Sequence, residues 1–240
     1  MYRRLSVVAA FSFLAALPAD AQLCAGTASF SAGRMQAGGQ VLSNDDYSSY
    51  GVGLSIGKPR GLYYGAQIGN NDYDFLDESG LWLGASGGYQ LRPAKQGFQI
   101  CPVVALAFGL GPDNIGGSDA DMSTRQFSAG AIIGMVAHRD GNFQIVPTGG
   151  LSVVNQKVTL ESSFGSADES DTFMALDLGA GFLINSVWTI RPMLSIPLGG
   201  DGRDESLSLG VSYNFGKRAT AAPARQPARQ PARQPARRKG

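Results

Sequence analysis

The sequence predicts an all-β protein folded as a closed antiparallel barrel of about ten strands. Apolar and small polar residues alternate through ten segments, most of them 9 to 14 residues long. A five-residue phrase opens three of these segments at a spacing of 45 residues, as Phe98–Pro102, Phe143–Pro147 and Trp188–Pro192. Long acidic stretches and short turns alternate between the segments. A repeated unit of two strands with two unequal connections indicates a β-hairpin repeated around a ring.

The expected strands run from residue 34 to residue 215. In chain order they are Arg34–Leu42, Ser49–Gly57, Gly61–Gly69, Gly80–Leu91, Gly97–Leu110, Gln126–His138, Asn142–Val158, Thr172–Ile184, Val187–Leu198 and Glu205–Phe215. Strands of soluble sheets usually have five or six residues, whereas a tilted strand needs about 9 to 11 residues to cross a bilayer. Eight strands is the alternative, if the first segment or the last turn is wrongly assigned.

The two faces of each expected strand differ in composition. In the last strand Leu207, Leu209, Val211, Tyr213 and Phe215 share one face, and serine, glycine and asparagine share the other. A face turned to water would be rich in charged residues, but the second face is mostly Gly, Ser, Ala and Gln. Small uncharged residues suit the inside of a narrow barrel whose apolar face meets lipid. The alternative is a secreted soluble barrel that binds a ligand, with the two faces exchanged.

The connections divide into two sets. The long acidic set is 43–48, 70–79, 111–125, 159–171 and 199–204; the short set is 58–60, 92–96, 139–141 and 185–186. With Glu205, the long set holds sixteen of the eighteen Asp and Glu between residues 22 and 216. Long loops outside the cell and short periplasmic turns are typical of outer-membrane barrels. An even number of strands then returns both ends of the barrel to the periplasm.

Both ends of the chain differ from the barrel segment. Residues 1–21 read as a secretory signal peptide, with Arg3 and Arg4, an apolar stretch and Ala19–Ala21 as the cleavage site. Residues 22–33 form an N-terminal segment and 34–216 the barrel. Residues 217–240 carry eight basic residues, no acids and a Pro-Ala-Arg-Gln repeat, which predicts a disordered tail. The positive charge of this tail offsets the negative charge of the barrel segment, so the whole chain has a net charge of only +1.

These features together resemble the small outer-membrane β-barrel proteins of Gram-negative bacteria, over residues 22 to 216. In that family the last strand ends in an aromatic residue that the barrel-insertion machinery reads, and Tyr213 and Phe215 match this signal. The family normally ends the chain near that aromatic residue, whereas 25 residues follow Phe215 here. The resemblance implies an outer-membrane location, periplasmic N- and C-termini, and contacts with membrane lipid and with the insertion machinery.

Two cysteines in an exported chain suggest one disulfide, between Cys24 and Cys101. Such a bond would hold the N-terminal segment against the lower lumen. Arg34, Asp177 and Arg191 are the charged residues expected on the inner face, with Asp177 and Arg191 on neighbouring strands. A pair of this kind could brace the barrel or constrict a channel.

The remaining polar candidates are weaker. Asp72, Asp74, Asp77 and Glu78 offer oxygen ligands for a cation, but they lack a calcium-loop motif, so solvated acidic loops are the simpler interpretation and no resident metal is expected. His138, expected inward near a short turn, lacks a serine–acid constellation, and catalysis is not expected. Pro102, Pro147 and Pro192 suggest a regular bulge near the short-turn rim.

The sequence therefore predicts an outer-membrane barrel with a structural or surface-interaction role and no cofactor. A narrow porin-like channel for small solutes is the alternative. Anionic cell-wall material is a possible partner of the basic tail, and no nucleic-acid partner is expected.

Overall fold

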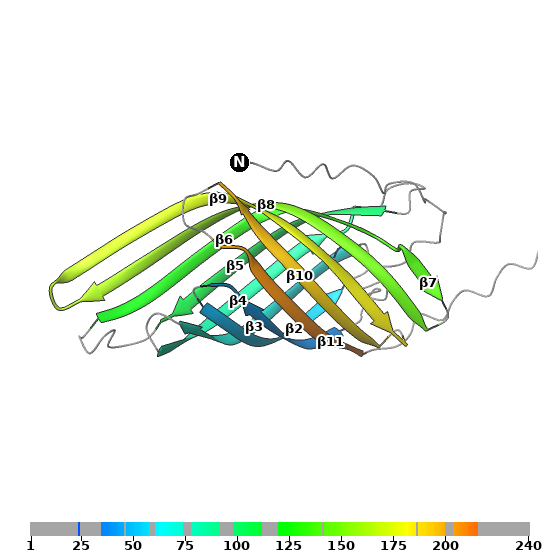
Figure 1. Cartoon of the computed structure of the whole chain (residues 1–240), viewed down its shortest axis with the longest axis horizontal. Coiled ribbons are helices and arrows are strands. Elements are labelled where there is room, and N and C mark those ends of the chain that lie inside the picture. The colour runs from blue at the N-terminus through cyan, green and yellow to red at the C-terminus, as the bar shows by residue number, and fades with distance from the viewer. Residues whose placement is uncertain are drawn as a thin grey trace, which may run out of the picture.

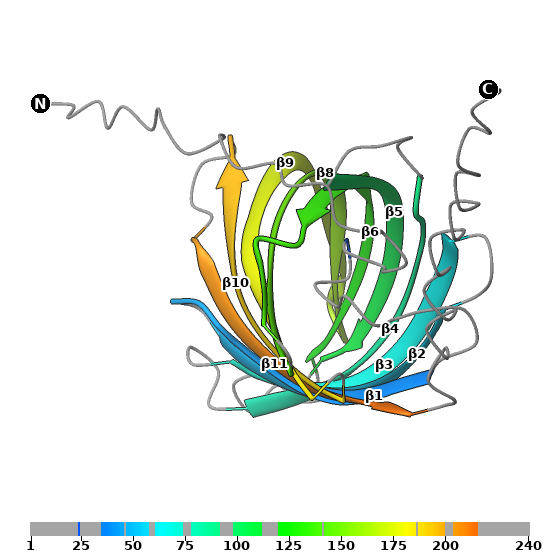
Figure 2. The same cartoon turned by 90° about the vertical axis from the view of Figure 1, so that its right-hand side faces the viewer.

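The computed structural model describes Cys24 and nine stretches between Met35 and Phe215. The stretches are residues 35–45, 47–57, 61–73, 78–91, 98–111, 120–140, 142–185, 187–199 and 204–215. They form a single antiparallel sheet that curls into a barrel (Figures 1 and 2). No helix among the described residues is long and apolar enough to cross a membrane.

The sheet contains ten long strands and one short one. They are β1 (Met35–Ser43), β2 (Tyr47–Gly57), β3 (Leu62–Tyr73), β4 (Glu78–Tyr89), β5 (Phe98–Leu110), β6 (Ala120–Met135), β7 (His138–Asp140), β8 (Phe143–Ser162), β9 (Gly165–Ile184), β10 (Trp188–Leu198) and β11 (Ser206–Phe215). β1 pairs with β11 from Met35↔Phe215 to Ser43↔Leu207, which closes the ring. β8 pairs with β6 and then, beyond the end of β6, with the short β7. The ten-stranded prediction is confirmed, and the eight-stranded alternative is wrong.

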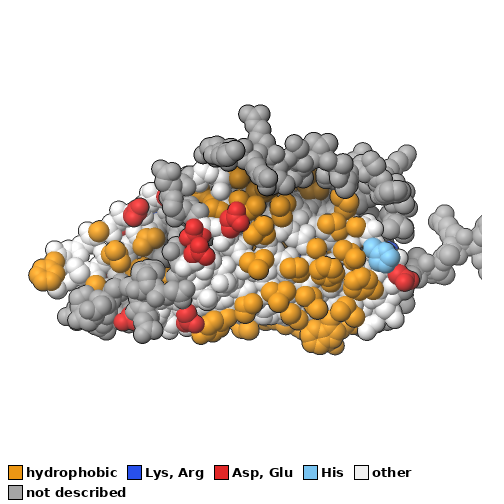
Figure 3. Space-filling view, in the orientation of Figure 1, with side chains coloured by type: hydrophobic (Ala, Val, Ile, Leu, Met, Phe, Trp, Pro, Cys, Tyr) orange, Lys and Arg blue, Asp and Glu red, His pale blue; other side chains and the backbone are white. Residues whose placement is uncertain are grey.

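Apolar side chains point outward around the whole ring. Val52, Leu110 and Leu207 are 61 to 63% exposed, whereas Val146 and Leu183 on the inner face are fully buried. The inner face also buries polar Gln99 and Thr189. Figure 3 shows hydrophobic side chains spread over the barrel body, with most of the visible acidic side chains toward the end where β8 and β9 project. This is the arrangement of a barrel whose outer surface meets hydrocarbon.

The inward glycines make room for two large aromatic side chains. A Cβ at Gly69 would lie 2.5 Å from the Trp82 indole, and a Cβ at Gly51 would lie 2.6 Å from the same ring. Trp82 therefore lies across β2 and β3 in space that only glycine leaves open. The Tyr63 ring covers Gly88 in the same way, too closely for any Cβ there. Glycine on the inner face is thus a packing requirement at these positions rather than a mark of an empty lumen.

The three repeated prolines interrupt the ladders without a common bulge. Pro192 leaves a gap in the β9–β10 ladder, but the register is the same before and after it. Pro102 pairs in continuous register with Ala131. Only Pro147 lies opposite a bulge, since β8 pairs as Thr148↔Gly134 on one side of it and as Ile145↔His138 on the other. The predicted regular bulge is therefore wrong for two of the three positions, because a missing N–H costs one hydrogen bond without adding a residue.

Much of the expected loop sequence is strand. The stretch 159–171 was expected as a long loop, but β8 runs to Ser162 and β9 starts at Gly165, with a two-residue turn between them. β6 similarly begins at Ala120, inside the expected loop 111–125, and β3 and β4 take both ends of 70–79. Since β10 pairs with β9 only from Met174 onward, the hairpin of residues 154–173 lacks β10 beside β9, whereas β6 stays paired with β8 up to Ala120↔Ser162. We call this hairpin the extension; Figure 1 shows it projecting past the other strands.

Candidate functional site: the lumen and the extension

The lumen contains a cavity of about 160 Å³ on the side formed by β1 to β4, β10 and β11. Its polar lining includes Gln36, Gln67, Tyr63, Thr189 and Arg191. Gln36 Nε2 donates a hydrogen bond to Ser212 Oγ, and Ser55 Oγ donates to Gln36 Oε1 at 3.4 Å, so one side chain links β11, β1 and β2. Uncharged polar groups joined in this way brace the wall from inside.

The predicted lumen charges lie apart from one another. Asp177 pairs in register with Ser195, and Ser195 is four residues along β10 from Arg191. At about 3.3 Å per residue this is a separation of about 13 Å along the strand, so the two side chains lie at different heights. Arg191 lines the cavity together with Tyr63, across the lumen, and Asp177 is not among its lining residues. Arg34 lies outside the described residues.

The predicted disulfide is present. Cys24 and Cys101 are bonded with a Cα–Cα distance of 6.0 Å, and their exposures are 4% and 0%. Cys101 lies on the inner face of β5, three residues from the strand's first residue, Phe98. The bond therefore anchors Cys24 to the inner face of β5, inside the short-turn end of the barrel.

His138 lies on the opposite face from the one predicted. It pairs with Ile145, and its ring centroid is 6.3 Å from that of the outward-facing Phe143. The cause is the bulge opposite Pro147, because one extra residue in a strand moves every later side chain to the other face. The side chain is exposed and lies outside the lumen.

The aromatic residues of the expected insertion signal lie together at the rim where β1 begins. The Tyr213 ring stands edge-on to Trp188 with centroids 5.0 Å apart, and it lies 5.7 Å from Phe215. Asn214 between them turns inward and donates a hydrogen bond from Nδ2 to the Val187 carbonyl at 3.0 Å. Aromatic rings in contact, like these two pairs, stabilise the fold by more than the area that they bury. Recognition of these residues by insertion machinery stays a prediction.

The expected acidic cluster is only partly described. Asp72 pairs in register with Ser79, next to the pair Tyr73↔Glu78. Asn70 Nδ2 donates a long hydrogen bond of 3.5 Å to Asp72 Oδ1. Asp74 and Asp77 lie outside the described residues, and the described part of the chain contains no group of three or more potential metal-ligating side chains. The cation site therefore stays a prediction.

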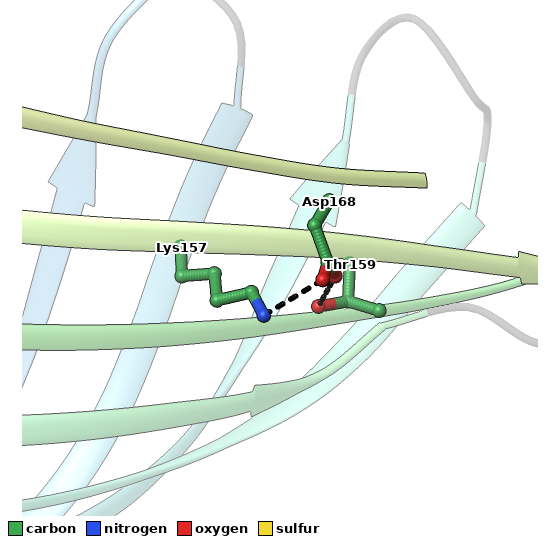
Figure 4. A network of polar contacts seen from close by, with 3 residues as sticks. All are labelled: Lys157, Thr159 and Asp168. Carbon is green, nitrogen blue, oxygen red and sulfur yellow. Dashed lines mark hydrogen bonds and ion pairs between the residues drawn. The ribbon is translucent and has the colours of Figure 1, made fainter. Parts of the chain in front are cut away.

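The extension carries a polar network of its own (Figure 4). Asp168 on β9 forms an ion pair with Lys157 on β8 at 2.9 Å, and Thr159 Oγ1 donates a hydrogen bond of 2.7 Å to its other oxygen. The hydrogen bond from Lys157, followed by that from Thr159, holds the pKa of the Asp168 carboxyl below its ordinary value of 3.8. The three side chains clamp the two strands together in water.

The tip of the extension presents an aromatic residue to solvent. Phe164 is 99% exposed, directly before Gly165, whose φ of 141° favours glycine. Ser162 Oγ accepts a hydrogen bond from the Phe164 amide at 3.3 Å and donates one to the Gly165 carbonyl at 3.1 Å. The turn is thus ordered by local contacts, and Phe164 is held away from the rest of the described chain. Sequence reasoning missed this hairpin and its tip.

Comparison with protein families and with curated proteins finds no match to this sequence. Among solved structures the fold is similar to the N-terminal β-barrel domain of Pseudomonas aeruginosa OprF, at 11% identity over 77% of this chain and 98% of that one, with a TM-score of 0.37. It is also similar to the attachment invasion locus protein Ail of Yersinia pestis, at 11% identity over 77% and 99%, with a TM-score of 0.36. The KdgM porin is similar at 8% identity over 75% and 99%, with a TM-score of 0.38. These similar structures are outer-membrane β-barrels.

Proposed function

We propose that this chain is an outer-membrane β-barrel that presents the extension at the cell surface for contact with another macromolecule. The extension itself is the observation that carries the proposal. The barrel wall ends at the pair Leu198↔Met174 on one side and near Ser123↔Leu110 on the other. β8 and β9 nevertheless continue as a paired, clamped hairpin beyond the pairs that close the ring, with β6 beside β8 up to Ala120↔Ser162. An ordered polar projection with an exposed aromatic tip is suited to binding.

The outward apolar face supports the placement in a bilayer. Each square ångström of apolar surface left in water costs about 25 cal/mol, and the apolar face extends around the whole ring. In the hydrocarbon region every backbone group needs an internal partner, and a closed ring of strands supplies it. Refolding residues 22–240 from urea tests this: β-structure and a heat-dependent gel mobility shift are expected only with detergent micelles. A stable β-rich protein in plain buffer would favour the secreted soluble binder instead.

We place the extension outside the cell and the end formed by Met35 and Phe215 in the periplasm. The acidic residues at the extension end and the position of Met35 and Phe215 at the opposite rim support this orientation. The insertion machinery would then meet Tyr213 and Phe215 from the periplasm, and the basic tail would lie near anionic cell-wall material. Deletion of residues 217–240 is expected to weaken association with the cell wall; unchanged association would contradict the role of the tail.

Cysteine labelling of intact cells tests the orientation. Phe164→Cys places a thiol at the tip of the extension, and Asp140→Cys places one at the exposed short-turn end. A membrane-impermeant maleimide is expected to label Phe164→Cys on whole cells and Asp140→Cys only after lysis. The reverse result would place the extension in the periplasm and overturn the proposed role at the surface.

A narrow channel is the second candidate, and the lumenal cavity favours it. Arg191 lines that cavity among uncharged polar side chains, so a passage through it would prefer anions. In planar bilayers the wild-type chain is expected to show small discrete steps with anion preference, and Arg191→Glu is expected to reverse that preference. Arg191→Gln serves as the neutral control. Absence of conductance steps from the refolded protein would reject the channel and leave the surface role as the proposed function.

A further inference from the structure

The outer edge of β9 has a strand neighbour on one side only. β9 pairs with β8 along its whole length, from Ser162↔Gly165 to Phe143↔Ile184. On the other side its pairing with β10 stops at Met174. Among the described residues, Gly165–Ser170 therefore forms an open sheet edge, and every side chain in it is exposed. Figure 1 shows this edge in the part of the hairpin that projects past the barrel.

The register determines which backbone groups face that edge. The Asn185 amide donates to the Asn142 carbonyl at 2.6 Å, so this position is a hydrogen-bonded pair. The β8–β9 register continues without a bulge to the tip, and such pairs recur at every second residue. Odd-numbered residues of β9 thus bond to β8. Ser166, Asp168 and Ser170 direct their N–H and C=O groups away from β8, toward the open edge.

We propose that this edge binds an extended basic peptide segment by strand addition. The inference rests on the proposed surface role, and it names the chemistry of the partner. An open edge supplies main-chain hydrogen bonds to an added strand, and side chains on both faces of the strand select its sequence. Asp168 lies on one face of β9 and Glu169 on the other, and no basic residue lies between Gly165 and Thr172. Lysine or arginine on the Glu169 face of the added strand therefore meets a carboxylate, and on the other face it shares the Asp168 carboxylate with Lys157.

The same charges disfavour a second copy of this chain as the occupant. Two β9 edges paired with each other would bring Asp168 and Glu169 of one copy beside the equivalent acids of the other. Like charges directly opposite each other destabilise a strand pair. Phe164, 99% exposed at the end of the edge, adds an apolar contact for a residue at one end of the added segment. The occupant is thus an extended, basic chain with at least one apolar side chain.

Peptide binding to the refolded full chain in zwitterionic micelles tests the inference. The probe is a fluorescein-labelled twelve-residue peptide in which lysine and threonine alternate, with one leucine near its end. Fluorescence anisotropy is expected to show saturable binding of this peptide, and at least ten-fold weaker binding of the same peptide with aspartate in place of lysine. N-methylation of alternate backbone amides of the lysine peptide is expected to abolish binding. Equal binding of the N-methylated peptide would overturn strand addition.

Proline substitutions on the protein provide the matched test. Ser170→Pro and Ser166→Pro each remove an N–H that faces the open edge and leave the β8 ladder intact. Both are expected to weaken binding at least ten-fold while amide-exchange protection of Ala167 and Glu169 persists, which shows that the hairpin is still paired. Wild-type affinity in both variants would reduce the interaction to general charge attraction and overturn the inference.

The cell-labelling experiment separates this inference from the proposed function. Surface labelling of Phe164→Cys without peptide binding in micelles would retain the surface role and reject the basic strand. Peptide binding without surface labelling would retain the edge as a binding site and reject its placement outside the cell.

Discussion

The barrel wall and the extension are built from the same two strands, yet they are stabilised differently. In the wall, β8 and β9 have a neighbour on both sides, one apolar face and one inner face, and Val146 and Leu183 are fully buried. In the extension, β9 has one neighbour and water on both faces, while β8 keeps β6 beside it. β9 is held there by its pairing with β8, by a short turn and by the contacts of Asp168 with Lys157 and Thr159. The comparison teaches that two strands can pair without alternating apolar and polar residues. That alternation arises only where the two faces of the sheet meet different surroundings.

The largest effect is expected from removal of the disulfide in the wall. The Cys24–Cys101 bond closes a loop of 77 residues, and loop-closure entropy assigns about 4 kcal/mol to such a bond as an upper bound. The double variant Cys24→Ser with Cys101→Ser is expected to unfold at lower urea concentration in micelles, with unchanged amide protection in the extension. Loss of protection in the extension would show that wall and extension unfold as one unit.

A glycine pair tests how tightly the wall is packed. In Gly69→Ala the new Cβ would clash with the Tyr50 carbonyl oxygen and lie 2.5 Å from the Trp82 indole, so overpacking is expected to cost about 1 to 3 kcal/mol. In Gly39→Ala, the matched control on β1, the nearest atom would lie at 3.5 Å, and little change is expected. The measurement is the urea midpoint of each variant in the same micelles. Equal midpoints for the two variants would mean that the groups around Gly69 shift to accommodate the added methyl group.

Shortening the extension is expected to change the stability of the wall little. Gln156 pairs with Asp171, so a two-residue Asn-Gly turn can join them in place of residues 157–170. Loop length affects folding free energy only weakly, and the β6 residues that lose their β8 partners, Ala120–Arg125, lie at the end of that strand. The free energy of unfolding, measured in urea, is therefore expected to fall by only about 1 kcal/mol. Binding of the lysine–threonine peptide is expected to disappear. A large loss of barrel stability would show that the wall depends on the extension for its stability.

The smallest effect is expected from titration of Asp168. Its pKa in the folded chain is held below the ordinary value of 3.8 by Lys157 and Thr159, so the carboxylate stabilises the hairpin above that value. The contribution is lost as pH falls through the lowered pKa, and exposure and salt weaken it. The amide protection factors of Leu160 and Ala167, a hydrogen-bonded pair of the β8–β9 ladder, are expected to fall below pH 4 in the wild type. The control Asp168→Asn is expected to lack this pH dependence.

Several features of the fold and of the candidate site follow from local sequence. The alternation through Ser206–Phe215 predicts the strand and both of its faces, and similar alternation predicts nine other strands, although β6 begins at Ala120 rather than Gln126 and β9 at Gly165 rather than Thr172. The Cys24–Cys101 bond follows from two cysteines in a chain whose first residues predict export. In each case the surroundings select the residue types one position at a time, so the pattern is visible without knowledge of distant neighbours.

Only the tertiary structure shows the rest. The extension has no apolar face, because water lies on both sides of β9, and the alternation that marks a strand in lipid is absent from Gly165–Thr172. His138 faces outward because a bulge opposite Pro147 adds one residue to the register. Gly69 and Trp82 meet across neighbouring strands although they are 13 residues apart in sequence. Asp177 and Arg191 lie on adjacent strands at different heights. Each of these depends on pairing register, which arises from contacts between strands and leaves no signal within a single strand.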